Sequence, residues 1–418
     1  MGLQQQIGRF GYLRWCQTLI VRLLTDLPVA GLTVALRCDF NVPLDPTGYI
    51  TDDLRIRAAI PTIEYLSEQR ATVVILAHLG RPKGKPVLSL SLAPVAERLS
   101  ELLGKPVHLI TGTDPLIVHQ EIERLTPGSV SLLENVRFDP RETSKIKEER
   151  MSLAQEWALW ADAYIADGFG VVHRAQASVT ELAELVPSAS GLLVTKESRV
   201  FTELLQGAKR PYTVILGGSK VSDKLGVITS LLPRVDNLLI GGGMAYTFLL
   251  AEGFSVGTSL QEPDFVDTVR EFLQQARDLG VNLLLPVDFV VAHEFSPDSD
   301  TRIVRSDQIP DGWMGLDIGP ETRDNFSRVI QQSKTVVWNG PMGVFEMPAF
   351  AQGTLSVAQA MADSAAFTVI GGGDSAAAVR LLDVAATKFD HISTGGGASL
   401  EFLEGKSLPG LAVLEGNQ

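Results

Sequence analysis

The feature that most constrains this chain is a series of short apolar runs, each followed by a segment with helical periodicity. The runs are rich in Val, Ile and Leu and show little alternation of apolar with polar residues. Strands of this kind are buried on both faces, as in a parallel sheet with helices on each side. The predicted strands are 33–37, 72–77, 129–134, 163–167, 212–217, 237–241, 282–286, 335–338, 367–371 and 391–394. The alternation predicts a doubly wound α/β fold.

The length of the chain indicates more than one domain. At 418 residues it is too long for one ordinary hydrophobic core and suits two or three domains. Residues 184–191 combine Pro, Ser and Gly between two series of strands, and the segment that follows reads as a connecting helix. We expect a first domain over 23–187, an interdomain hinge helix over 188–206, a second domain over 207–400 and a tail over 401–418.

Residues 1–22 have a composition of their own, with three arginines and no acidic residue. Mitochondrial presequences share this composition, but here serines are missing, and the apolar stretch is too interrupted for a secretory signal. We interpret the segment as an extension outside the fold, either disordered or the result of a start codon assigned too far upstream.

Charge and cysteine content exclude several classes of protein. The formal net charge of −13 argues against general nucleic-acid binding. No apolar run reaches the roughly 18 residues of a membrane span. Cys16 and Cys38 cannot form a disulfide framework, which favours a reducing cytoplasm. Residues 1–190 contain 19 basic and 22 acidic side chains, and the remainder contains 17 and 27. The acidic second half therefore needs backbone N–H groups or a metal to bind an anion.

Polar and mostly basic side chains follow the predicted strands of the first half. Ligands of open α/β sheets bind at the carboxyl ends of the strands, and arginine matches phosphate and carboxylate geometry. One such arginine more often caps a strand or pairs with a surface acid, but the repetition predicts a site for a small polyanion. The residues are Arg37, Asp39, Asn41, Arg55, His78, Arg81, Lys83, Lys85, Arg137, His173 and Arg174.

The second half has glycine-rich turns where the first has arginines. The stretch "LGGSKVSDK" (216–224) places Lys220 and Lys224 at a strand-to-helix turn, although its spacing is not that of a P-loop. Such a turn still offers backbone N–H groups to a phosphate. Three further turns contain triple glycine, at 241–243, 371–373 and 395–397, and the loop "WNGPMGVFE" (338–346) bears Asn339 and Glu346.

Only one of the triple-glycine turns carries an acid directly after the glycines. Asp374 begins the predicted helix in "IGGGDSAAA". A carboxylate there can meet the Mg²⁺ that accompanies a nucleotide, or it can simply cap the helix. Residues 371–376 also match a loose dinucleotide pattern, with Asp390 near the expected acid spacing, so a nicotinamide-dependent oxidoreductase is an alternative. Against it, Asp374 would repel a bare pyrophosphate.

The two halves together favour phosphoryl transfer. The sequence contains neither G-x-S-x-G nor a zinc spacing of Cys and His. What remains is a cationic anion site in one half and a nucleotide-phosphate site in the other. Phosphoryl transfer needs positioning and charge neutralisation more than covalent chemistry from the protein.

Long motifs then connect the chain to a known family. From about Leu23 to the C-terminus it resembles the phosphoglycerate kinase family, in "RCDFNVP", "AHLGRP", "LLENVRF", "HRAQAS", "LGGSKVSDK", "IGGGMAYTFL", "GWMGLDIGP", "VVWNGPMGVFE", "IGGGDSAAA" and "STGGGASLEFLEGKSLPG". The resemblance implies two Rossmann-like domains that close about a hinge helix, with the tail folding back on the first. It implies reversible phosphoryl transfer from 1,3-bisphosphoglycerate to ADP, giving 3-phosphoglycerate and ATP, by a Mg²⁺-dependent, cytoplasmic, monomeric enzyme.

The resemblance also assigns roles to residues. It implies catalytic roles for Arg55, Lys220, Gly396 and Gly397. It implies 3-phosphoglycerate binding by Asp39, Asn41, Arg55, His78, Arg81, Arg137 and Arg174. It implies nucleotide binding by Gly218, Ser219, Lys220, Lys224, Gly242, Gly315, Asn339, Glu346, Gly372, Gly373, Asp374 and Ser375, with Asp374 also on the metal.

Some positions depart from the family pattern. Cys38 stands where Val is usual, Ser219 replaces Ala, Ser375 replaces the commoner Thr, and "ADGFGVVHRAQAS" replaces "NDAFGTAHRAHAS". The charged site residues are all kept, so we expect an active enzyme.

Overall fold

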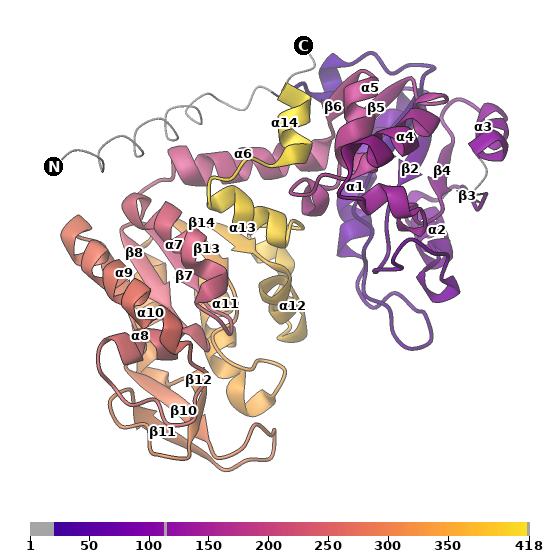
Figure 1. Cartoon of the computed structure of the whole chain (residues 1–418). Coiled ribbons are helices and arrows are strands. Elements are labelled where there is room, and N and C mark those ends of the chain that lie inside the picture. The colour runs from indigo at the N-terminus through magenta and orange to yellow at the C-terminus, as the bar shows by residue number, and fades with distance from the viewer. Residues whose placement is uncertain (1–20, 113–114, 416–418) are drawn as a thin grey trace. The chain divides into compact units, whose positions relative to one another are not determined.

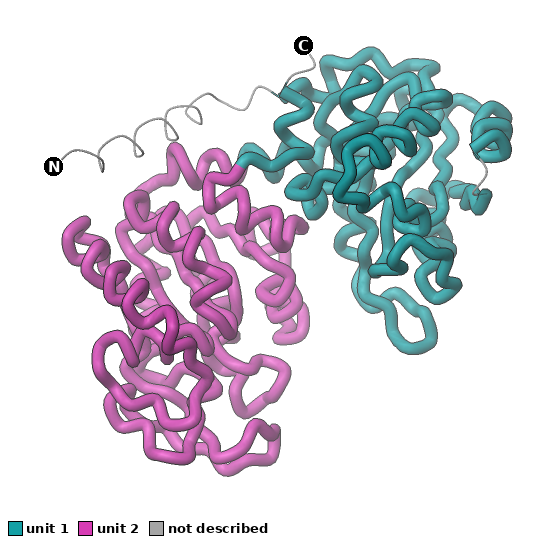
Figure 2. The backbone as a smooth tube through the Cα atoms, in the orientation of Figure 1, with its two compact units in different colours: residues 1–199, 407–418 teal, residues 200–406 magenta. Residues whose placement is uncertain are grey.

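The computed structural model describes residues 21–112 and 115–415. Contacts divide the chain into unit 1, residues 1–199 with 407–418, and unit 2, residues 200–406 (Figure 2). The interpretation of residues 1–22 as an extension falls almost entirely outside the described residues. Within them, no helix combines the length and apolar character needed to cross a membrane.

Unit 1 is built on a six-stranded sheet in the order β3-β4-β2-β1-β5-β6, with every pair parallel. Figure 1 labels most of the helices and strands of this unit. Its strands are β1 (Thr33–Arg37), β2 (Thr72–Leu76), β3 (Val107–Ile110), β4 (Val130–Leu133), β5 (Ala163–Ala166) and β6 (Ser188–Ser190). Its helices are α1 (Leu54–Glu68), α2 (Ala93–Leu103), α3 (Pro115–Glu123), α4 (Lys147–Ala158), α5 (Leu182–Leu185) and α14 (Pro409–Glu415).

Alternate residues of the central strands enter two separate cores. Val34 and Leu36 pack in one cluster with residues of α1 and α2, whereas Ala35 and Tyr164 pack in the other with residues of α3, α4 and α5. A strand with apolar residues on both faces reads as a continuous apolar run, which is why the sequence shows no alternation here. The sheet is therefore covered on both faces, as the doubly wound prediction requires.

Unit 2 repeats the plan with a parallel sheet in the order β15-β14-β13-β7-β8-β9. Its strands are β7 (Tyr212–Leu216), β8 (Asn237–Ile240), β9 (Asn282–Leu284), β13 (Thr335–Asn339), β14 (Phe367–Gly371) and β15 (His391–Ile392). Its helices are α7 (Leu225–Leu231), α8 (Met244–Ala251), α9 (Val266–Leu279), α10 (Pro320–Gln332), α11 (Gln352–Ala362), α12 (Gly373–Leu381) and α13 (Gly397–Leu403).

Unit 2 also contains a small antiparallel sheet in the order β11-β10-β12, which the sequence analysis did not identify. Its strands are β10 (Asp288–Ala292), β11 (Thr301–Arg305) and β12 (Met314–Ile318). The predicted fold class is confirmed: two doubly wound domains with mostly parallel sheets.

Helix α6 (Leu192–Gln206) connects the two units, and the division falls between Arg199 and Val200 inside it. Residues 188–190, which the sequence analysis assigned to the hinge segment, form the edge strand β6 of the unit 1 sheet. The chain returns to unit 1 at Ser407, and α14 buries Leu414 in the core that contains Tyr164.

Candidate functional site

The strand order of unit 1 reverses between β1 and β5. Strands β2 and β4 extend the sheet on one side of β1, whereas β5 and β6 extend it on the other side. Ligands of open α/β sheets bind at such a reversal, outside the carboxyl ends of the strands. The predicted polyanion-binding residues follow β1, β2, β4 and β5, or open α1. The topology therefore brings them to one edge of one sheet.

Asp39, Asn41 and Arg55 form a connected group at this edge. Arg55 lies in the first turn of α1; its guanidinium donates to the Asn41 carbonyl at 2.6 Å and lies 3.7 Å from the Asp39 carboxylate. The Asn41 side-chain oxygen accepts from the backbone N–H of Gly80 at 2.8 Å. These bonds hold the loop after β1 against the loop after β2.

Arg137 and His78 supply buried cationic and imidazole groups. Arg137 donates to the Gly80 carbonyl at 2.9 Å, while its Nε is buried without a hydrogen-bond partner among the described residues. Burial and the charges of Arg37 and Arg174 lower the pKa of Arg137 to about 10. Burial, Arg37 and further arginines hold the pKa of His78 well below its usual value, so its ring is neutral.

Arg174 and Arg81 are exposed at the same edge. Nε of Arg174 donates to Nε2 of His173 at 3.0 Å. Burial and the neighbouring Arg174 charge lower the pKa of His173 to about 4, so this ring is neutral and accepts the hydrogen bond. His173 thus orients Arg174.

Mutual repulsion among these cations indicates the kind of ligand that fits. Arg37, Arg55, Arg137 and Arg174 all act on the pKa of His78 in the same direction. A binding edge with this excess of positive charge is stabilised by an anion, and a small ligand with two or more negative charges suits it best. Arg37 is buried and its guanidinium contacts His78. In the sequence its position at a strand end was the one signal of a role in this site.

In unit 2 the strand order reverses between β7 and β13, and a cavity of about 230 Å³ lies at that reversal. Its walls come from the carboxyl ends of four adjacent strands, β15, β14, β13 and β7. The lining residues are Gly217, Gly218, Ser219, Lys220, Asp223, Lys224, Asn339, Gly340, Gly372, Gly373, Asp374, Ser375, Gly396, Gly397 and Leu400. Most of the predicted nucleotide-site residues are among them.

The glycines of these turns serve two different purposes. A Cβ added at Gly340 would lie 2.3 Å from the carbonyl oxygen of Gly217, and one at Gly242 would lie 2.6 Å from the backbone of Gly218. These glycines let turns pack backbone to backbone. At Gly218, Gly373 and Gly396 an added Cβ would meet nothing within 4 Å, so open space adjoins their backbone. A phosphate can approach the chain closely at those three positions.

Two polar contacts organise the cavity floor. The Lys224 ammonium donates to the side-chain oxygen of Asn339, and the Ser375 hydroxyl accepts from the backbone N–H of Gly340 at 2.7 Å. Burial lowers the pKa of Lys224. Nδ2 of Asn339 is buried without a partner among the described residues, so it remains available to an acceptor.

Asp374 does not cap α12. The N-cap position is Gly372, no side chain makes a cap hydrogen bond there, and the Asp374 carboxylate is exposed in the first turn. The described residues contain no group of three or more His, Cys, Asp or Glu side chains that could hold a metal alone. Mg²⁺ is typically bound by one or two carboxylates plus phosphate oxygens and water, and Asp374, on the wall of the cavity together with Asp223, fits that pattern.

Three predicted nucleotide-site residues lie outside the cavity lining. Gly242 packs on the turn after β7. Gly315 lies in β12, where an added Cβ would come within 2.0 Å of the Tyr246 hydroxyl oxygen. Glu346 is exposed in the loop after β13.

The position of Asp390 argues against the nicotinamide alternative. Its carboxylate accepts from the backbone N–H of Thr368 at 2.8 Å. Thr368 lies near the amino end of β14, and Asp390 directly precedes β15. The acid therefore sits at the opposite edge of the sheet from the glycine turns, where it cannot bind a ribose of a nucleotide held by them.

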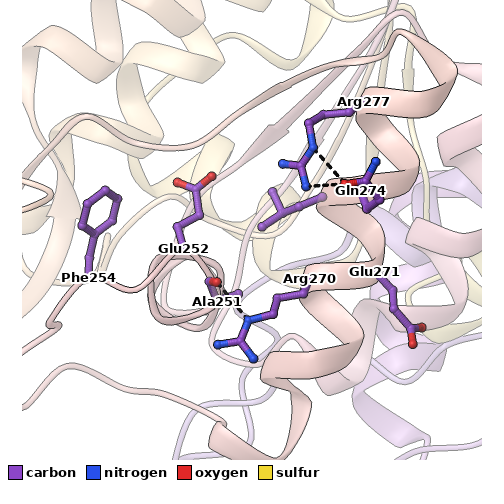
Figure 3. A pocket seen from close by; sticks show the side chains of 8 residues that line it. Ala251, Glu252, Phe254, Arg270, Glu271, Gln274 and Arg277 are labelled. Carbon is purple, nitrogen blue, oxygen red and sulfur yellow. Dashed lines mark hydrogen bonds between the residues drawn. The ribbon is translucent and has the colours of Figure 1, made fainter.

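A larger hollow of about 750 Å³ lies between α8 and α9, and contains none of the predicted site residues (Figure 3). Arg270 there donates to the Ala251 carbonyl at 3.1 Å, and Arg277 donates to Gln274. Because these guanidiniums are engaged and the hollow lies away from the strand ends, it is not the candidate site.

Comparison with known proteins gives one family. The protein-family model described as phosphoglycerate kinase matches residues 24–406 of this chain. The chain is 56% identical over 391 residues to a phosphoglycerate kinase of Leifsonia xyli, covering 92% of this chain and 97% of that protein. It is 55% identical to one of Bifidobacterium adolescentis, covering 94% and 100%. The solved phosphoglycerate kinase structure from Coxiella burnetii matches with a TM-score of 0.83 at 40% identity, covering 94% of this chain and 98% of that one.

Proposed function

This chain belongs to the phosphoglycerate kinase family, and we infer that it catalyses the reversible transfer of a phosphoryl group from 1,3-bisphosphoglycerate to ADP, giving 3-phosphoglycerate and ATP. It is a phosphotransferase of glycolysis with a carboxyl group as acceptor in the reverse direction. The observation that carries this function within the structure is the glycine-lined cavity at the strand reversal of unit 2, with two lysines, Lys220 and Lys224, and two carboxylates, Asp223 and Asp374, on its wall.

We propose that the basic edge of unit 1 binds 3-phosphoglycerate. The ligand carries a phosphate and a carboxylate, which match the arginine forks gathered there. Arg137, Arg174 and Arg81 are available to the phosphate, because each has donor atoms beyond those that the described protein groups occupy. Asp39, Asn41 and His78 offer acceptors and a donor to the hydroxyl group of the substrate.

We propose that the cavity of unit 2 binds the phosphates of ADP or ATP. Lys224 and Nδ2 of Asn339 lie on its floor, and the open backbone at Gly218 and Gly373 admits phosphate oxygens. Asp374 would hold Mg²⁺ together with those oxygens, and bound Mg²⁺ would neutralise charge on the phosphates. Gly242, Gly315 and Glu346 remain proposals for the rest of the nucleotide.

We propose direct in-line transfer between the ligands of the two sites. The two substrates are both anions, so a cation must lie between them when they meet. Arg55 at the first site and the exposed Lys220 at the second are the side chains suited to that role. Backbone N–H groups of Gly396 and Gly397 at the start of α13 would donate to the phosphoryl oxygens. Because the two sites belong to different units, we propose that the units close about α6 before transfer.

A coupled assay tests the function directly. Purified full-length protein with 3-phosphoglycerate, ATP and Mg²⁺ should form 1,3-bisphosphoglycerate, detected by NADH oxidation with excess glyceraldehyde-3-phosphate dehydrogenase. Omission of Mg²⁺ with a chelator present should abolish the signal. Absence of turnover in the complete mixture, from folded protein, would contradict the function. We further propose that the protein is cytoplasmic and monomeric. Light scattering on the purified protein tests the monomeric state, because it measures the mass of the particle in solution.

A further inference from the structure

A buried carboxylate outside the predicted site lies behind the 3-phosphoglycerate edge. Glu142 is in a short 3-10 helix, Pro140–Thr143, and its side chain is fully buried. Both of its oxygens accept hydrogen bonds from Ser178: one from the backbone N–H at 2.9 Å and one from the hydroxyl at 2.7 Å. A buried carboxylate with a hydrogen bond to each of its oxygens is held in one orientation.

Ser178 connects Glu142 to Arg37, because its hydroxyl group bonds both side chains. It lies in a π-helical turn, Ala177–Glu181, which begins three residues after Arg174. The Ser178 hydroxyl accepts from Nε of Arg37 at 2.7 Å. Because the hydroxyl has one proton and gives it to the Glu142 carboxylate, its lone pair must face the guanidinium.

Arg37 in turn determines which nitrogen of His78 carries the proton. Its NH2 group lies 3.3 Å from Nδ1 of His78. A guanidinium has donors and no acceptor, so Nδ1 must be the unprotonated nitrogen. The neutral ring then carries its proton on Nε2, as a donor.

The charges agree with this chain of contacts. Arg37 is 1% exposed, and a guanidinium this deeply buried requires a negative partner. Glu142 is fully buried one hydroxyl away from it. Asp39 is a second acid near the ring, but its Oδ1 lies 4.0 Å from Nδ1 of His78, too far for a hydrogen bond, and accepts instead from the backbone N–H of Asn41.

We propose that Glu142 is a positioning residue for substrate binding: through Ser178 and Arg37 it holds His78 in the tautomer that presents an Nε2 proton to 3-phosphoglycerate. This inference rests on the proposed 3-phosphoglycerate site. Glu142 itself does not touch the substrate.

The first test is kinetic, on the full-length enzyme. In Glu142→Gln the amide keeps the shape but loses the charge, and its NH₂ competes with Arg37 for the Ser178 oxygen. We expect the KM for 3-phosphoglycerate to rise about tenfold, with the KM for MgATP within twofold of the original. Ser178→Ala should show the same selective rise, and it keeps the inference testable if Glu142→Gln does not fold.

A matched control separates positioning from stability. Glu181 belongs to the same π-helical turn, is equally buried and pairs with Arg150 at 2.6 Å, but the structure shows no bond from it to Arg37 or His78. Glu181→Gln should lower the melting temperature without changing the KM for 3-phosphoglycerate. An equal rise in KM for this variant would reduce Glu142 to a structural role.

The second test reads the tautomer. In ¹⁵N-histidine-labelled protein without ligand, two-dimensional ¹H–¹⁵N spectra should show His78 as the Nε2–H form, and as a mixture in Glu142→Gln. Addition of 3-phosphoglycerate to the original protein should shift the His78 signals. No shift would refute the proposed site. A shift in the original protein, with an unchanged tautomer and KM in Glu142→Gln, would overturn the positioning role alone.

Discussion

At the scale of single residues, Lys220 and Lys224 lie four positions apart at one turn yet have different environments. Lys224 is buried and bonded to Asn339, whereas Lys220 is exposed on the cavity wall. A fixed lysine suits a phosphate that stays in place. An exposed lysine can follow the phosphoryl group as it moves, and so can stabilise the transition state more than the ground state.

Lys220→Ala should therefore lower kcat by about two powers of ten, because the positive charge that we propose acts on the transferring group is lost. The KM for 3-phosphoglycerate should change little, since Lys220 is in the other unit. Steady-state kinetics with both substrates varied checks this. Near-normal turnover would remove Lys220 from the catalytic set.

Arg81→Ala should give the opposite pattern. Arg81 is exposed at the unit 1 edge, so its loss should raise the KM for 3-phosphoglycerate about tenfold through one missing charge-assisted contact. The KM for MgATP should stay the same. Lys105→Ala, at a lysine of unit 1 that bonds Ser67, is a suitable control and should leave both constants unchanged. An unaltered KM for 3-phosphoglycerate in Arg81→Ala would count against the assignment.

Asp374→Ala should impair use of MgADP far more than binding of 3-phosphoglycerate. The carboxylate does not cap its helix, so its removal should change the stability of the protein little. The substitution should instead weaken binding of the complex of Mg²⁺ with the nucleotide. Titration calorimetry with ADP, with and without Mg²⁺, should show that Mg²⁺ no longer strengthens binding in the variant. If Mg²⁺ strengthens binding equally in both proteins, Asp374 is not the metal residue.

Residues near strand ends could be predicted from the sequence, and residues behind them could not. Asp39, His78 and Arg174 follow apolar runs that are readable as strands, so topology alone brings them together. Glu142 and Ser178 lie in a 3-10 helix and a π-helical turn. Neither element has a hydrophobic period, and the hydrogen bond between Ser178 and Arg37 joins residues 141 positions apart.

At the scale of elements, the predicted strands all occur, and most of them have apolar residues buried on both faces. Two of the strands that were missed, β11 and β6, lack that signal, whereas β10 is mostly buried and was missed all the same. β11 reads "TRIVR" with four of five residues exposed, and β6 is the three small residues "SAS" in a segment that resembles a linker. Edge strands owe their conformation to a neighbouring strand, which local sequence does not reveal.

The turns after the strands of unit 2 depend on glycine for close packing. Gly340→Ala should destabilise the protein by several kcal/mol, because its φ of +93° is strained for alanine and its Cβ would clash with Gly217. Gly253→Ala is the matched control, with a φ of +94° and nothing within 4 Å of an added Cβ. It should cost only the strain, about 1–2 kcal/mol. Equal losses in denaturant unfolding would show that the backbone contact is unimportant.

At the scale of the whole molecule, buried carboxyls make stability depend on pH. Asp167 follows β5, and its Oδ1 accepts from the backbone N–H of Leu193 at the start of α6. Burial raises the pKa of Asp167 from 3.8 to about 8 and that of Asp317 to about 7. The folded chain therefore binds these protons more tightly than the unfolded chain, so stability falls as pH rises from about 4 to about 8.

Asp167→Asn should reduce this pH dependence, because the amide resembles the protonated acid and cannot ionise. Between pH 5 and pH 8 the melting temperature of the variant should fall by roughly 5 °C less than that of the original protein. Asp267→Asn, at an acid that is 92% exposed, should change nothing. Parallel melting curves for Asp167→Asn and the original protein would contradict the prediction.

The return of the chain to unit 1 after unit 2 has a consequence for biosynthesis. Unit 2 is one continuous segment from Val200 to Lys406, whereas unit 1 is built from two separated segments, residues 1–199 and 407–418. Unit 1 buries Leu414 of α14 in the core that holds Tyr164, and that segment is translated after all of unit 2. Unit 1 is therefore begun first and completed last during translation. The apolar surface of its core that Leu414 covers stays uncovered until α14 has been synthesised.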